Sequence, residues 1–69
     1  MDKQQILKHC YVLGHWAGES NKERLSSKDS NFRQFFDAQA KRYDYTFRLD
    51  CIDQWYIGFD SVKDSENMR

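Results

Sequence analysis

Two histidines and two cysteines are the residues of this chain best suited to bind a metal. His9, Cys10 and His15 lie in the stretch HCYVLGHW, and Cys51 follows Cys10 by 41 positions. Imidazole and thiolate groups are the ligands of tetrahedral zinc sites. Ligands on one helix share a face when they are three or four residues apart, whereas Cys10 and His15 are five apart. We therefore predict no metal site and no cofactor, with two reduced thiols packed inside the fold.

The components of nucleophilic catalysis are also present, because the chain contains Cys, Ser, His and carboxylate side chains. None of them lies in a glycine-flanked nucleophile motif, and the three glycines form no phosphate-binding loop. A chain of 69 residues also has little room for a substrate pocket of roughly 300 Å³ or more. We predict that the protein is not an enzyme and has no catalytic residue.

Charge is balanced over the chain but is unevenly distributed. Lys+Arg and Asp+Glu both number 11, so the net charge typical of a non-specific DNA binder or of an acidic DNA mimic is missing. Residues 1–42 carry eight basic and five acidic side chains, and residues 43–69 carry three and six. Six basic residues are candidates for a phosphate-binding patch: Lys22, Arg24, Lys28, Arg33, Lys41 and Arg42. Carboxylates interspersed among them dilute this patch, so a small DNA-associated transcriptional regulator is the alternative function.

A helix is expected over residues 2–17. Its apolar residues recur at intervals of three and four: Ile6, Cys10, Leu13 and Ala17. Asp2 is placed to cap the helix, and Gln5 completes a capping-box pattern. Gly18 is a natural stop, and Gly14 indicates close packing against another element.

A polar loop is expected over residues 18–31, with a short helical turn at Ser20, and a second helix follows it. One face of this helix is apolar: Phe32, Phe35, Phe36, Ala40 and Tyr43. Ser30 or Asn31 can cap it. The next stretch, YDYTFRLDC, alternates apolar and polar residues, which is the period of a half-buried strand, so we expect an extended segment over residues 44–49.

The stretch DQWYIGFD, Asp53 to Asp60, fits two structures. A helix places Trp55, Tyr56 and Phe59 inside, and it leaves an acidic edge with one aliphatic residue outside: Asp53, Ile57, Asp60 and Asp64. A strand would pair with the preceding segment in a β-hairpin. We favour the helix because its periodicity continues to Val62 and because no tight-turn signal precedes the stretch. The acidic edge is our predicted partner-binding surface.

Residues 32–63 combine an aromatic helix, FRQFFDAQAKRYD, with an extended piece and a last helix containing WYIGF. This combination resembles small accessory proteins of tailed phages and related mobile elements. Proteins of this kind commonly bind a host protein, such as a defence complex or a regulator, and inhibit or redirect it. The resemblance implies an anti-defence or inhibitory role and assigns no functional residue.

Together these patterns predict one small, mainly α domain over residues 1–69, with three helices and a frayed tail at 64–69. Its expected core is Leu13, Trp16, Phe32, Phe35, Phe36, Tyr43, Phe47, Trp55 and Phe59. The N-terminus has no sustained apolar run, so we expect a cytoplasmic protein with no membrane partner. We predict a non-enzymatic module that binds a host protein stoichiometrically, and a domain this small would gain stability as a homodimer.

Overall fold

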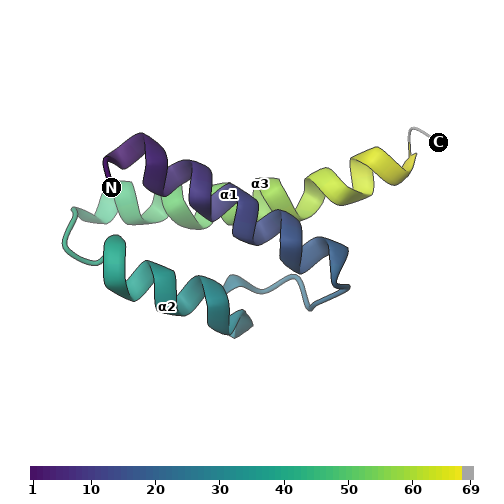
Figure 1. Cartoon of the computed structure of the whole chain (residues 1–69), viewed down its shortest axis with the longest axis horizontal. Coiled ribbons are helices and arrows are strands. Elements are labelled where there is room, and N and C mark those ends of the chain that lie inside the picture. The colour runs from purple at the N-terminus through teal and green to yellow at the C-terminus, as the bar shows by residue number, and fades with distance from the viewer. Residues whose placement is uncertain (68–69) are drawn as a thin grey trace.

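A computed structural model shows three α-helices and one short 3-10 turn (Figure 1). It describes the backbone of residues 1–67 and the side chains of residues 1–62. The elements are α1 (Lys3–Glu19), η1 (Ser26–Lys28), α2 (Ser30–Gln39) and α3 (Tyr45–Asn67). In Figure 1, α1 and α3 lie side by side and run in the same direction. The helix that connects them in the sequence, α2, runs in the opposite direction. The predicted mainly α class is confirmed, and the alternative β-hairpin is wrong because residues 1–67 contain no strand.

The start of α1 is the one predicted from the sequence. The Asp2 carboxylate accepts from the backbone N–H of Gln5 at 2.8 Å, and the Gln5 side chain accepts from the backbone N–H of Asp2 at 3.0 Å. This reciprocal pair satisfies two N–H groups that a helix start otherwise leaves without partners. The helix ends at Glu19, two residues beyond the predicted end. The turn expected at Ser20 does not form, and a 3-10 turn occurs later at Ser26–Lys28.

Glycines allow the backbones of α1 and α3 to approach each other closely. A Cβ atom added to Gly14 would overlap the backbone carbonyl of Trp55, and one added to Gly58 would overlap the carbonyl oxygen of Tyr11. Gly18 forms the next contact along the seam, where an added Cβ would lie 2.7 Å from the Phe59 carbonyl oxygen. The two longest helices therefore pack with almost no side chain between them at these points.

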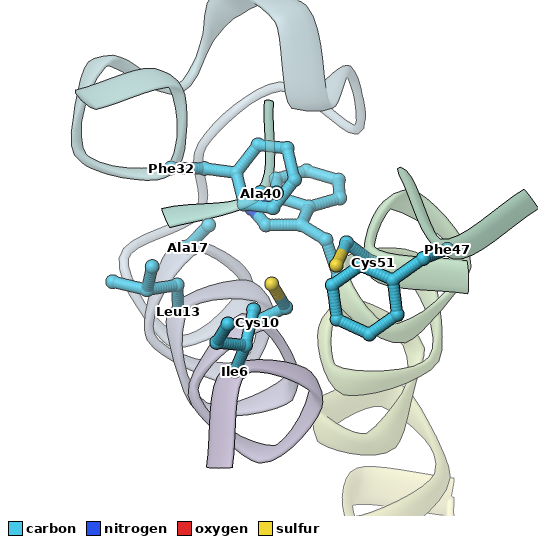
Figure 2. Packing of buried hydrophobic residues seen from close by; sticks show 9 residues of the cluster. Ile6, Cys10, Leu13, Ala17, Phe32, Ala40, Phe47 and Cys51 are labelled. Atoms are coloured by element: carbon cyan, nitrogen blue, oxygen red, sulfur yellow. The ribbon is translucent and has the colours of Figure 1, made fainter. Parts of the chain in front are cut away.

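The core fills the space around this helix pair. Its buried members are Ile6, Cys10, Leu13, Ala17, Phe32, Ala40, Phe47, Cys51 and Trp55. Figure 2 shows Cys10 of α1 close to Cys51 and Phe47 of α3, with Phe32 and Ala40 together at the other end of the cluster. The expected core residues that are only partly buried pack against this cluster: Phe35, Phe36, Tyr43 and Phe59.

Trp16 is not a core residue, and that prediction is wrong. Its side chain is 58% exposed. Trp16 follows Gly14 by two residues, which is about 200° around a helix, so it lies on the side of α1 away from α3.

The extended segment expected over residues 44–49 is also wrong, because α3 already begins at Tyr45. Asp44 caps this helix by accepting from the backbone N–H of Phe47 at 2.9 Å. The alternating apolar residues divide between two faces of the helix. Phe47 and Cys51, four residues apart, are buried, whereas Tyr45 and Leu49, also four apart, are exposed. The alternation thus reflects two apolar stripes of one helix.

The second helix is shorter than expected, and it begins earlier. Its cap is Asp29, which accepts from the backbone N–H of Asn31 at 3.1 Å, and its last residue is Gln39. The other carboxylate oxygen of Asp29 accepts from the indole N–H of Trp55 at 2.9 Å, and Asp29 is only 4% exposed. One buried side chain therefore fixes both the start of α2 and its position against α3.

Of the tail expected to fray at 64–69, residues 64–67 belong to the backbone of α3, and residues 68–69 lie outside the described residues. Among the helices of residues 1–67, none combines the length and the hydropathy that a membrane crossing needs.

Candidate interaction surface

The predicted partner-binding residues on α3 share its outer side, opposite the buried residues. Asp53 is exposed, and Ile57 is 52% exposed. Asp60 lies half-buried on the same side. The side chain of Asp64 lies outside the described residues. The helical periodicity therefore placed these three described residues correctly relative to one another.

Asp60 does not act as a separate acidic group, because it forms an ion pair with Arg24. The Arg24 Nε and Nη2 atoms donate to the two carboxylate oxygens of Asp60 at 2.8 and 2.7 Å. The Arg24 guanidinium also lies over the Tyr56 ring, 4.8 Å from its centroid. The hydrogen bonds to Asp60 raise the pKa of the Arg24 guanidinium. This pair joins one residue of the predicted basic patch to one residue of the predicted acidic edge.

Other members of the predicted basic patch also face carboxylates of this chain. Lys28 pairs with Glu23 at 3.2 Å, and Lys41 pairs with Asp37 at 3.3 Å. Lys22 lies 3.8 Å from a carboxylate oxygen of Asp29. Four of the six basic residues are thus balanced by neighbouring acids; Arg33 and Arg42 are the two for which no such pair forms within the described residues.

A hollow between α2, η1 and α3, which the sequence did not predict, lies next to the acidic edge. Its volume is about 220 Å³. It is lined by Ser26, Ser27, Phe32, Arg33, Phe36, Asp37 and Ile52. The aromatic rings and the isoleucine make its surface mostly apolar, and the serines and the two charged residues supply polar groups. We refer to it as the α2–α3 hollow.

Exposed apolar side chains continue from this hollow across α3. Leu49 is three residues before Ile52, so the two are neighbours on the helix surface, and Leu49 is 42% exposed. Asp53 follows Leu49 by four residues, and Ile57 follows Asp53 by four. We call Leu49, Asp53 and Ile57 the α3 outer surface. The sequence prediction missed Leu49 because it assigned that residue to an extended segment.

The two cysteines are free and lie together inside the fold. Cys10 and Cys51 are both 0% exposed and face each other between α1 and α3 (Figure 2). Burial away from water raises the pKa of each thiol, since it disfavours the charged thiolate. A buried, protonated thiol is a poor nucleophile and a poor metal ligand.

The histidines do not complete a metal site with these thiols. His9 stacks on the Phe35 ring of α2, with ring centroids 4.1 Å apart, whereas His15 lies against Ser61 of α3 at 2.8 Å from Nδ1 to Oγ. Within the described residues, no three metal-binding side chains gather in one place.

The raised thiol pKa values predict a loss of stability at alkaline pH. The folded state keeps both thiols protonated, so their contribution to stability is constant below the unfolded pKa of about 8.5. Above that pH the unfolded chain releases protons that the folded chain retains. The free energy of unfolding should fall by up to about 1.4 kcal/mol per pH unit for each thiol.

Urea unfolding measured between neutral pH and pH 10 checks this. The Cys10→Ala/Cys51→Ala double variant serves as the control, because it lacks both thiols and keeps every other side chain. The variant should be less stable at neutral pH but should lose less stability as the pH rises. If the free energy of unfolding falls equally steeply with pH in the two proteins, the thiol pKa values are not raised in the folded state.

Comparison of the chain with protein-family models, with curated proteins and with solved structures finds no match.

Proposed function

We propose that this protein is a non-enzymatic binding domain that attaches to a partner protein in a fixed stoichiometry through the α3 outer surface and the α2–α3 hollow. The observation that supports this most is the continuity of the two features. An apolar hollow of about 220 Å³ has Ile52 of α3 in its wall, exposed Leu49 lies about one turn before Ile52, and 52%-exposed Ile57 lies about two turns beyond Leu49. Exposed apolar groups that adjoin a concavity are typical of protein interaction sites.

The composition of this surface resembles the centre and rim of a protein interface. Phe32, Phe36 and Ile52 offer an apolar pocket for one large side chain of the partner. Arg33 and Asp37 supply hydrogen-bonding groups at the edge of the pocket. Asp53 adds a charge beside the exposed aliphatic residues, which favours a partner surface that is basic and apolar.

The biological role that fits such a surface is inhibition or redirection of a host protein. This part of the proposal rests on the resemblance of residues 32–63 to small accessory proteins of tailed phages and mobile elements. A host defence complex or regulator is the expected target. Binding by a rigid, preformed surface needs little reordering of the domain, which suits a small inhibitor.

The alternative, a DNA-associated regulator, has less support from the surface charges. Four of the six basic side chains offered for phosphate contact face carboxylates of the same chain. Phosphate binding would have to break these pairs. A DNA complex would also weaken steeply as salt is raised, so a gel shift at two salt concentrations distinguishes the two functions.

Affinity capture from a bacterial lysate with matched variants tests the proposed function. The tagged wild-type domain should retain one dominant protein, identified by mass spectrometry, in an equimolar amount. Leu49→Arg and Ile57→Arg should each reduce its recovery at least about tenfold, because an introduced charge opposes apolar docking. Gln34→Arg, on the exposed side of α2, is the control and should retain the partner. Equal recovery with all variants, or recovery of nucleic acid alone, would refute the proposal.

A further inference from the structure

A second apolar surface lies on α1, away from both α3 and the proposed binding surface. Trp16, which is 58% exposed, is its largest side chain. An open hollow of about 310 Å³ lies on the same side of the helix and is lined by Met1, Gln5, Lys8, His9 and Val12. We call it the α1 hollow. Val12 precedes Trp16 by four residues, so the tryptophan and the α1 hollow follow one stripe of α1.

Four residues that line the α1 hollow have the spacing that forms a hole in knobs-into-holes packing of helices. Gln5, Lys8, His9 and Val12 stand at positions i, i+3, i+4 and i+7. Four residues in this arrangement receive one side chain, the knob, from a facing helix. Stacking of His9 on Phe35 at 4.1 Å holds one wall of the hole against α2. The helix therefore carries both a hole and, one turn after it, an exposed side chain that can act as a knob.

A second copy of the chain fits this surface when the two α1 helices run antiparallel. A two-fold axis near the middle of the stripe exchanges its two ends, so Trp16 of each copy meets the α1 hollow of the other. A parallel pair would place Trp16 against Trp16 and leave both hollows unfilled. The shape of the surface is thus self-complementary in the antiparallel arrangement only.

The charges along the stripe agree with the antiparallel arrangement. Lys8 lies near the N-terminal end of the stripe and makes no ion pair with the side chains that the structure describes. Glu19 lies at the C-terminal end, and its side chain is 57% exposed beside His15. Exchange of the two ends brings Lys8 of each copy alongside the last turn of α1 in the other, where Glu19 lies. A parallel pair would place like charges together.

We infer that the chain forms a symmetric homodimer through antiparallel α1 helices, with each Trp16 seated in the α1 hollow of its partner. The α3 outer surface lies on the far side of each copy and stays accessible. The dimer would then present two copies of that surface, and two binding sites on one particle bind a multivalent target more tightly than either site alone.

Light scattering coupled to size-exclusion chromatography over a concentration series tests this. Wild type should approach twice the 8.4 kDa of one chain. Trp16→Lys should raise the dimer dissociation constant at least about tenfold, because exposed tryptophans at interfaces carry much of the affinity. Trp16 is 58% exposed and lies outside the core of the monomer, so far-UV circular dichroism should show the variant folded. Ile57→Lys, on the α3 outer surface, should remain a dimer.

A charge exchange tests the antiparallel geometry itself. Lys8→Glu and Glu19→Lys should each weaken the dimer, and the double variant Lys8→Glu/Glu19→Lys should restore it. A mass of one chain at every concentration would overturn the inference. A double variant whose dimer dissociation constant is no lower than those of the single variants would also overturn it. The same holds if Ile57→Lys abolishes the dimer, or if Trp16→Lys stays dimeric and loses only its capture of the lysate partner. Dissociation by Ile57→Lys and loss of partner capture by Trp16→Lys would also bear on the α3 outer surface. A monomeric wild type or a double variant that is not restored would leave that surface untouched, so the two proposals can fail separately.

Discussion

Gly14→Ala should lose a large part of the domain's stability, even though alanine is the better helix former. The added methyl group would overlap the backbone carbonyl carbon and oxygen of Trp55 on α3. Overpacking costs about 1–3 kcal/mol where side chains can move aside, and here backbone meets backbone, so we expect at least about 3 kcal/mol. The gain in helix propensity is only about 1 kcal/mol. A domain of this size has a total stability of about 3–10 kcal/mol.

Urea unfolding followed by circular dichroism measures this loss, and the other glycines supply graded comparisons. Gly58→Ala should behave alike, because its methyl group would overlap the Tyr11 carbonyl oxygen. Gly18→Ala should cost less, since its added Cβ lies 2.7 Å from the nearest backbone atom. Gln34→Ala, at an exposed side chain of α2, should leave the free energy of unfolding almost unchanged. A Gly14→Ala protein as stable as wild type would show that α1 and α3 do not cross this closely.

Asp29→Ala should destabilise the domain by about 2–4 kcal/mol. The substitution removes the cap of α2, which is worth about 1 kcal/mol. It also leaves the indole N–H of fully buried Trp55 without its acceptor, at a cost of about 1–3 kcal/mol. The segment before α2 would lose one of its attachments to α3 as well, while the Arg24–Asp60 pair would remain. Urea unfolding followed by tryptophan fluorescence gives both the loss of stability and the change around Trp55.

Asp44→Ala is the matched control, because Asp44 also caps its helix through a backbone N–H but is itself exposed and accepts from no buried side chain. Its cost should be about 1 kcal/mol. Asp29→Asn keeps an oxygen acceptor and should be intermediate. Equal losses for Asp29→Ala and Asp44→Ala would mean that the bond to Trp55 contributes little to stability.

Local patterns were enough to predict α1 and the general class of the fold. The Asp2–Gln5 capping box and the stripe from Ile6 to Ala17 both depend on residues a few positions apart. The same kind of pattern was misleading between Tyr43 and Cys51, because a short apolar alternation fits either a strand or two faces of one helix. Asp44, as a cap, was the local signal for the helix.

The candidate site was only partly predictable, because most of it depends on contacts between distant residues. Helical periodicity correctly placed Asp53, Ile57 and Asp60 on one side. The Arg24–Asp60 pair joins residues 36 apart, and the Asp29–Trp55 bond joins residues 26 apart. These contacts fix the loop and α2 against α3 and thereby form the α2–α3 hollow. Spacing along the sequence carries no information about either contact.

Photo-crosslinking in bacterial cells tests the central proposal, binding of a protein by the α3 outer surface, most directly. A photoreactive amino acid is placed at position 57, at position 49, or at position 34 on exposed α2 as the control. Positions 57 and 49 should each give one dominant covalent adduct with the same partner protein, and position 34 should give little of it. Equal adducts at all three positions, or none at 49 and 57 while the protein is folded and expressed, would contradict the account.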